Sequence, residues 1–213
     1  MFNVKTFTFN PLGENTYVVS DADGAAVVID CGALYPEECN SLAAYIDAEG
    51  LKPHEHLLTH AHFDHAFGAA FLYERYGLKP RCTAGDLPLL SDMEQQMRDV
   101  IGHAISIPSA PIGETLSEDV DVKVGQMNFR VLACPGHTAG GACFYEATER
   151  ILFSGDSLFC GSIGRTDFPT GNHWELIRSL QRLLRILPDD IIVYPGHGPS
   201  TTIGNERRYN PYL

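Results

Sequence analysis

Short apolar runs, separated by residues that favour turns, divide the chain into strands and helices. Runs of alternating or continuous apolar residues predict strands, and longer segments with apolar residues every three or four positions predict helices. In the first half we expect strands near Val4–Phe9, Tyr17–Ser20, Ala25–Asp30 and Leu57–Thr59 and helices over Pro36–Glu49 and Ala66–Tyr76. In the second half we expect strands near Val120–Val124, Asn128–Leu132, Ala142–Tyr145, Ile151–Phe153 and Ile191–Tyr194 and a helix over His173–Leu187. This alternation indicates sheets covered by helices.

The segment between the two halves interrupts the alternation. From Asp86 to about Ile105, apolar residues recur at roughly helical spacing, so we expect one helix there. Pro108, Pro111 and Gly113 then break the helical pattern. Two interpretations stay open, because an insertion of this kind either covers a pocket as a lid or only packs against the core.

Length and composition indicate one ordinary domain spanning residues 1–213. Hydrophobic residues make up 44% and charged residues 20%, as in soluble proteins. The sequence contains no apolar run of the about 18 residues that a membrane span needs. Residues Met1–Asn10 have a strand pattern and lack the basic start and apolar centre of a signal peptide. We therefore expect a cytoplasmic protein without a membrane partner.

Charge and cysteine content narrow the partners further. The formal net charge of −12 repels phosphate backbones, and basic residues cluster only at Arg207–Arg208, which argues against nucleic acid as a partner. Six cysteines are scattered without Cys-x-x-Cys spacing, which argues against a disulfide framework or a thiolate zinc site. We expect reduced cysteines that mostly pack in the core. The oligomeric state stays open.

The densest chemical signal is a hexapeptide in which His60, His62, Asp64 and His65 follow the apolar pair Leu57–Leu58. Side chains alternate at the end of a strand, so the first two imidazoles can project to one side. The turn into the next helix carries Asp64 and His65 to a second position. Chance clustering would rarely place three of the nine histidines within six residues. The arrangement suits two adjacent metal ions.

Three further strand ends repeat this arrangement in the second half. Each apolar run leads to a glycine and one side chain of a ligand type, and these side chains are His137, Asp156 and His197. Glycine permits a tight exit with close backbone approach, and a proline before two of the three glycines cannot continue the strand ladder. We therefore expect the metal-ligating residues to be His60, His62, Asp64, His65, His137, Asp156 and His197.

These motifs resemble those of the metallo-β-lactamase superfamily from Asp30 to His197, which is nearly the whole chain. The resemblance implies an α/β protein with the αββα sandwich of that superfamily. It further implies one metal ion on His60, His62 and His137, a second on Asp64, His65 and His197, and Asp156 as the bridge between them. Asp64 and Asp156 would be the catalytic carboxylates, while Asp30 would support the site or serve a turn. Two divalent ions are expected, with zinc as the simplest choice and iron or manganese as alternatives.

Within the superfamily, the chain is similar to short relatives of glyoxalase II, which hydrolyse the thioester S-D-lactoylglutathione. The similar stretches are Thr59–His65, Gly155–Phe159 with Gly164–Pro169, and Pro195–Pro199 with Glu206–Pro211. Because only residues 198–213 follow His197, the helical domain with which classical glyoxalase II binds glutathione is not expected. The implied function is hydrolysis of a small-molecule thioester by a hydroxide that bridges two metal ions, with weak selectivity for glutathione.

Other members of the superfamily match less well. The commonest exported β-lactamases carry Cys at the position of Asp156, flavodiiron proteins carry Glu at that of His62 and add a flavin domain, and nucleases need a basic path. The main alternative is a persulfide dioxygenase, which the chain resembles at Gly164–Phe168. That resemblance would imply a single iron held by His60, His137 and Asp156. The sequence of the segment Pro195–Pro199 resembles that of the hydrolases more than that of the dioxygenases.

The remaining polar signals are weaker. His54, His56, His103 and His173 lack ligand spacing and are expected at the surface or at helix caps. Arg165 and Asp167 are expected to pair and to support the loop that follows Asp156.

Overall fold

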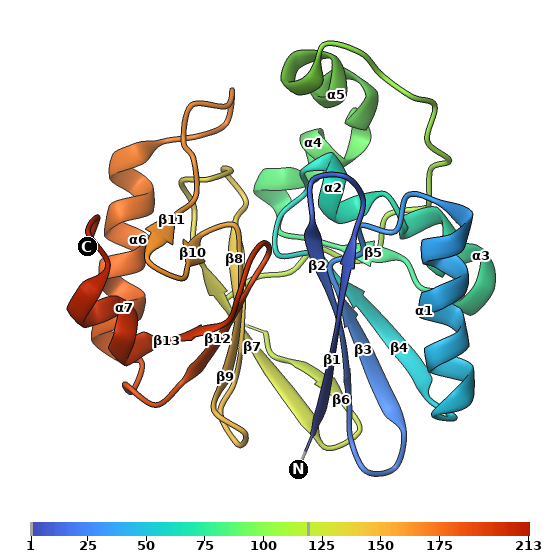
Figure 1. Ribbon diagram of the computed structural model, residues 1–213, viewed down its shortest axis with the longest axis horizontal. Coiled ribbons are helices and arrows are strands. Elements are labelled where there is room, and N and C mark those ends of the chain that lie inside the picture. The colour runs from blue at the N-terminus through green and yellow to red at the C-terminus, as the bar shows by residue number, and fades with distance from the viewer. Residues whose placement is uncertain (1, 119) are drawn as a thin grey trace.

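The computed structural model describes residues 2–118 and 120–213, and in this part of the chain two large β-sheets pack face to face (Figure 1). The first sheet has the order β1-β2-β3-β4-β5, with bounds Asn3–Phe9, Glu14–Ser20, Ala25–Ile29, Lys52–Leu57 and Pro80–Arg81. The second has the order β13-β12-β9-β8-β7-β6, with bounds Thr201–Thr202, Ile192–Pro195, Ile151–Gly155, Ala142–Glu146, Met127–Ala133 and Val122–Val124. A short hairpin is formed by β10 (Leu158–Phe159) and β11 (Ser162–Ile163).

Helices cover the outer face of each sheet. On one side lie α1 (Pro36–Ala48) and α3 (Ala69–Tyr76), and on the other lie α6 (His173–Ile186) and α7 (Ile203–Tyr209) (Figure 1). The helices α2 (Phe63–Ala66), α4 (Leu87–Ser91) and α5 (Met93–Ile101) gather at one end of the sandwich, drawn at the top of Figure 1. This arrangement confirms the αββα sandwich.

The apolar strands bury both of their faces. In β3, Val27 and Ile29 contribute to the core between the sheets, whereas Ala26 and Val28 pack in the cluster that includes Leu42 of α1. Successive side chains of a strand point to opposite faces, so a strand between a sheet and a helix layer is apolar at every position. The continuous apolar runs of the sequence have this cause.

Strand directions explain why the polar motifs meet. β3 and β4 are parallel, and so are β9 and β12. β7 shares the direction of β9, because each is antiparallel to β8. Within each sheet, the carboxyl ends of these strands therefore lie at the same end of the strands. This is the end of the sandwich that carries α2, α4 and α5 (Figure 1).

The prediction of one continuous helix over Asp86–Ile105 is wrong. A 3₁₀ turn, η1 (Ala84–Asp86), precedes α4 and α5, and the chain leaves helical geometry at Asp92 between them. Asp92 caps α5, because its Oδ1 accepts a hydrogen bond from the Gln95 backbone N–H. Gly102 ends α5 at a φ of 78°, a left-handed conformation that glycine adopts without strain.

Other boundaries also differ from the expectation. The helix expected over Ala66–Tyr76 begins at Ala69 as α3, after the separate short helix α2, and β4 begins at Lys52 and ends before Leu58. The strand expected at Val120–Val124 is shorter in the structure, where β6 begins at Val122. The helix α7 and the short strands β5, β10, β11 and β13 were not expected. No helix among the described residues is long and apolar enough to cross a membrane.

Candidate metal centre

The structure brings all seven predicted site residues together at the end of the sandwich where these strands have their carboxyl ends. The ligand atoms of His60, His62 and His137 lie within 4.8 Å of one another, and so do those of Asp64, His65 and His197. These two groups match the two ligand sets that the sequence resemblance implies. Asp156 joins His60 and His65 in a third group of the same kind.

Asp156 lies between the two groups of ligand atoms. Its Oδ1 is 3.4 Å from His65 Nε2, and its Oδ2 is 3.7 Å from His137 Nε2 and 3.6 Å from His197 Nε2. One carboxylate therefore faces imidazoles of both groups. This is the position that a bridging ligand requires.

Hydrogen bonds on the outer side fix the orientation of two imidazoles in the first group. The Nδ1–H of His137 donates to the Arg165 carbonyl oxygen at 2.7 Å, since a carbonyl oxygen only accepts. The Thr59 hydroxyl donates to Asp30 Oδ2 at 2.8 Å and therefore accepts from His60 Nδ1, 3.1 Å away. In their neutral forms both rings then present a bare Nε2 to the site.

The second group is supported in the same way. The Nδ1–H of His65 donates to Asp30 Oδ2 at 3.0 Å, and that of His197 donates to the Leu12 carbonyl oxygen at 3.2 Å. Asp30 thus accepts from both His65 and Thr59, so it supports the site rather than serving only a turn. The Nε2 atoms of the two rings face the carboxylates of Asp64 and Asp156.

Several inward atoms are buried without a hydrogen-bond partner among the described residues. They are His60 Nε2, His65 Nε2 and Asp156 Oδ1. Buried polar atoms are nearly always satisfied in native proteins, and an unsatisfied group costs about 1–3 kcal/mol. Imidazole nitrogens and carboxylate oxygens that converge in this way are a suitable donor set for zinc, iron or manganese. The residues therefore fit metal ions.

The surroundings of the site favour neutral rings at His60 and His62, an ionised Asp156 and a protonated His65. Burial first, and then the neighbouring imidazoles, lower the pKa of His60 and lower that of His62 to about 3. Burial opposes ionisation of Asp156, but adjacent imidazoles, His65 foremost, outweigh burial and lower its pKa. Burial also disfavours a charged His65, but the surrounding carboxylates outweigh it and raise the pKa of this ring. A metal ion would displace the proton from His65.

Two glycines are required by the close approach of these strand ends. Gly155 has a φ of 49°, and a Cβ on it would overlap the Thr59 side chain. A Cβ on Gly196 would overlap Asp156 Oδ1. The glycines beside the ligands therefore leave room for the carboxylate and for the turn that carries it.

Two carboxyl groups near the centre were not expected from the sequence. Both Asp86 oxygens are bonded: Oδ2 accepts from the Ala61 N–H at 2.9 Å and Oδ1 from the Gly140 N–H at 2.6 Å, which ties the two histidine loops together. Glu14 is fully buried behind the centre, where burial raises its pKa, and its Oε2 accepts from the Gly32 N–H at 3.0 Å. Neither residue has diagnostic spacing, and Asp86 resembles an ordinary helix cap.

The prediction for the other histidines is wrong at His56. His54, His103 and His173 are exposed, but His56 is fully buried, and neither ring nitrogen has a partner among the described residues. Burial lowers the pKa of His56 to about 3, so the ring is neutral. The expected ion pair between Arg165 and Asp167 is confirmed at 2.7 Å, and the guanidinium also lies over the Phe168 ring.

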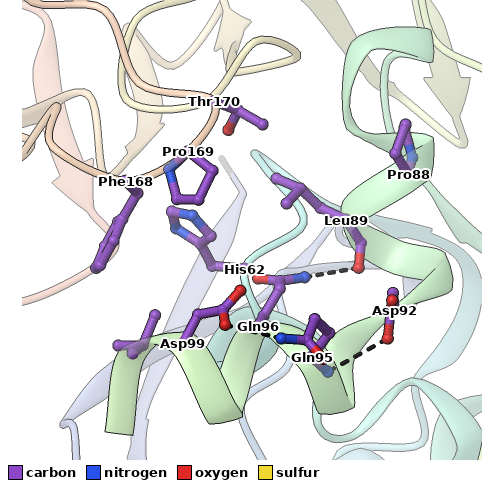
Figure 2. Close-up of a pocket in the computed structure, with 11 residues that line it drawn as sticks. His62, Pro88, Leu89, Asp92, Gln95, Gln96, Asp99, Phe168, Pro169 and Thr170 are labelled. Atoms are coloured by element: carbon purple, nitrogen blue, oxygen red, sulfur yellow. Dashed lines mark hydrogen bonds between the residues drawn. The ribbon is translucent and has the colours of Figure 1, made fainter. Parts of the chain in front are cut away.

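Two cavities adjoin the centre. One, of 220 Å³, lies over the site and is lined by Asp64, His137, Asp156 and His197 among others. The other, of 190 Å³, lies between α4–α5 and the loop Phe168–Thr170 (Figure 2). The segment that interrupts the strand and helix alternation therefore lines a pocket.

Comparisons with known proteins agree with this geometry. A family model described as the metallo-beta-lactamase superfamily matches residues 9–197. Hydroxyacylglutathione hydrolase GloC of Haemophilus influenzae is 34% identical over 211 residues, which cover 99% of this chain and 98% of that protein. TTHA1623, solved in a di-iron-bound form, is 41% identical with a TM-score of 0.87, covering 99% of this chain and 100% of that one. BLEG-1 B3 metallo-beta-lactamase is 34% identical with a TM-score of 0.90, covering 100% and 99%.

Proposed function

This chain belongs to the metallo-β-lactamase superfamily, and from that membership we propose that it is a binuclear metal-dependent hydrolase of thioesters, of the glyoxalase II type. Members of the superfamily are mostly metal-dependent hydrolases, its fold binds metal ions, and the described residues of this chain include clusters of histidine and aspartate. The similarity to a hydroxyacylglutathione hydrolase of nearly the same length supports the thioester as substrate.

One observation carries the binuclear part of the proposal. Two complete groups of three ligand residues face each other across Asp156, and hydrogen bonds on the outer side orient four of the five imidazoles. A single metal ion would need only one of these groups. Supporting hydrogen bonds of this kind are typical of metal-bound histidines.

The residues of the site account for thioester chemistry. Two divalent ions held here would supply an activated water and polarise the substrate carbonyl. Asp156 lies between the two groups and Asp64 belongs to the second, and both stay ionised, because neighbouring imidazoles outweigh burial and lower the pKa of both carboxyls. The site offers no obvious general acid, but a thiol with a pKa of about 8.5 leaves readily as thiolate. Hydrolysis of a thioester therefore suits the groups present.

The proposal also covers the kind of substrate, the metal ions and the cellular location of the enzyme. The substrate is a small molecule, because the cavity over the centre measures only 220 Å³. The net charge of −12 disfavours nucleic acid. We propose a cytoplasmic enzyme whose ions are zinc, iron or manganese, with zinc preferred and iron supported by the di-iron form of TTHA1623.

The direct test compares reactions on one metal-loaded preparation. With S-D-lactoylglutathione as substrate, we expect release of free thiol. With glutathione persulfide as substrate, we expect no oxygen consumption. Oxygen consumption without thioester cleavage would instead support the mononuclear iron dioxygenase, with His60, His137 and Asp156 as ligands. A chelator should abolish thioester cleavage, and metal should restore it.

A second candidate, β-lactam hydrolysis, is favoured by the similarity to BLEG-1 B3 metallo-beta-lactamase. A β-lactam releases an amine, which needs a proton that a thiolate does not need. We therefore expect a chromogenic cephalosporin to be cleaved far more slowly than the thioester. Faster cleavage of the cephalosporin would reverse the order of the two proposals.

A further inference from the structure

The 190 Å³ cavity beside the metal centre, which we call the α5 cavity, adjoins the cavity over the ligands. It shares three lining residues, His62, Val100 and Phe168, with the cavity over the ligands. The aromatic ring of Phe168 packs against His62 with centroids 5.2 Å apart. This pair therefore lies at the boundary of the two cavities, and a substrate held at the centre would have to pass it to reach the α5 cavity.

The floor of the α5 cavity carries an acceptor without a donor. Gln96 is only 9% exposed, and its amide Nε2 donates to the carbonyl oxygens of Ala61 at 3.0 Å and Leu89 at 2.6 Å. These two bonds fix the orientation of the amide, because carbonyl oxygens only accept. Gln96 Oε1 is left buried and unpartnered among the described residues. A ligand with an N–H or O–H group would satisfy it.

The opposite wall of the cavity carries a second polar atom of the same kind. Thr170 Oγ1 is buried and has no hydrogen-bond partner in the described part of the chain. Figure 2 shows Thr170 and Gln96 on opposite sides of the cavity, with apolar side chains of Pro169 and Leu89 beside them. An amide-bearing chain between these walls could donate to Gln96 and accept from Thr170.

Charge at the cavity is negative on one side only. Asp92 and Asp99 line it, held by Gln95: Asp92 Oδ1 accepts from the Gln95 N–H and Asp99 Oδ1 from the Gln95 Nε2 at 2.8 Å. The described lining residues include no lysine or arginine. Arg165 lines the neighbouring cavity, where both Asp167 oxygens bind its guanidinium. An anionic group would therefore be repelled from the α5 cavity.

We propose that the α5 cavity binds the thiol half of the thioester and selects a small, uncharged or cationic thiol over an anionic one. The inference rests on the proposed thioester hydrolysis. Its reacting carbonyl must lie at the metal ligands, and the lactoyl group is small, so the thiol half is the part that reaches beyond His62. A volume of 190 Å³ is below the roughly 300–1,000 Å³ of sites that enclose drug-sized ligands, which disfavours a whole tripeptide.

The test uses three lactoyl thioesters of similar size with the metal-loaded enzyme. Their thiols are N-acetylcysteamine, which is neutral and carries an amide, thiocholine, which is cationic, and 3-mercaptopropionate, which is anionic. We expect kcat/KM for the anionic ester to be lower than for the other two by roughly 10-fold, as two nearby carboxylates would cause in a partly screened site. Equal kcat/KM for all three esters would overturn the inference.

Variants separate the charge contribution from the hydrogen bonds. Asp92→Asn with Asp99→Asn should close most of the gap between the neutral and anionic esters, whereas Glu94→Gln, on α5 but outside the cavity lining, should leave it unchanged. Thr170→Val removes a hydroxyl without a partner, so it should not destabilise the fold. It should lower kcat/KM for the N-acetylcysteamine ester about 3-fold and leave the thiocholine ester unchanged.

A binding measurement keeps this inference separate from the hydrolase proposal. Thioether analogues, with a CH₂ in place of the carbonyl, can be titrated calorimetrically against the same metal-loaded protein. If no thioester is cleaved but the neutral analogue still binds more tightly than the anionic one, hydrolysis fails and the cavity assignment stands. If the esters are cleaved but the Asp92 and Asp99 changes leave the ranking of thiols intact, the cavity assignment fails alone.

Discussion

The metal centre and the α5 cavity differ in how many of their polar groups are oriented by hydrogen bonds from the surrounding residues. At the centre, four imidazoles are held from outside by acceptors, so their inner nitrogens converge before any ligand arrives. In the α5 cavity, Gln96 and Thr170 present buried atoms that the described residues leave without partners. Both places hold unpartnered inner atoms, but those of the centre follow strand ends and converge in groups, whereas those of the α5 cavity lie on α5 and on the loop Phe168–Thr170. The comparison indicates that the ligand atoms are preorganised on strand ends, whereas the proposed selectivity rests on two separate segments.

The largest expected effect comes from removing the carboxylate between the two ligand groups. Asp156→Ala should lower thioester turnover by a factor on the order of 10²–10³, as removal of one preorganised stabilising group does at other active sites, and should reduce metal content. Turnover and metal content per chain are the two readouts. His173→Ala, an exposed histidine on α6, is the matched control and should change neither. Equal damage from both would show that the centre is misassigned.

A smaller effect is expected at the support behind the ligands. Asp30→Asn replaces an oxygen that accepts from His65 and Thr59 with an amide, so it should weaken metal binding roughly 10- to 100-fold. Competition with a chromogenic chelator measures the affinity. Asp47→Asn, which alters an exposed pair with Arg75, should have no effect on metal binding. Unchanged affinity in Asp30→Asn would mean that the outer hydrogen bonds do not orient the ligands.

The pH dependence of metal binding sharpens the comparison further. Burial disfavours a charged His65 or His197, but the nearby carboxylates raise the pKa of both rings above their usual range in the metal-free protein. Protons on these rings compete with metal, so affinity should be full above the raised pKa values and fall as the pH drops through them. We expect about a 10-fold loss per pH unit for each proton displaced.

Proton release on metal addition, measured in a weakly buffered solution at pH 7, checks the same point. Release of at least one proton per chain is expected. By contrast, binding of the neutral thioether to the α5 cavity should vary little between pH 7 and 8. A metal affinity that stays constant as the pH falls to 6 would contradict the protonation states assigned to His65 and His197.

The smallest effect is expected at the exposed ion pair near the centre. Asp167→Asn should leave turnover within about a factor of three, because exposed pairs contribute little. A large loss would mean that Asp167 positions the Arg165 loop, whose carbonyl oxygen accepts from His137.

The centre was predictable from sequence for a physical reason. Each ligand follows a short apolar strand, and His137, Asp156 and His197 also stand beside a glycine, so residue type and local turn carry the signal. Parallel strands then bring these ends to one edge without further information from the sequence. The role of each residue as a metal ligand stays a prediction, whereas their convergence is a property of the fold.

The α5 cavity was not predictable in the same way. Gln96, Thr170 and Asp92 come from two segments without shared spacing, and only tertiary packing places them around one space. The burial of His56 was likewise not predictable, because the polar residues Lys52–His56 lack the apolar pattern that indicates a strand, although they form most of β4. The break between α4 and α5 depends on a cap at Asp92, which the apolar spacing of the segment does not reveal.

Metal titration of the metal-free protein tests the central claim most directly. Protein stripped with a chelator is titrated with zinc or manganese, and hydrolysis of a lactoyl thioester is followed at each addition. The account predicts that activity rises to its maximum at about two ions per chain, one for each group of three ligands. Full thioester hydrolysis at one ion per chain, or a single iron that supports only oxygen consumption, would contradict it.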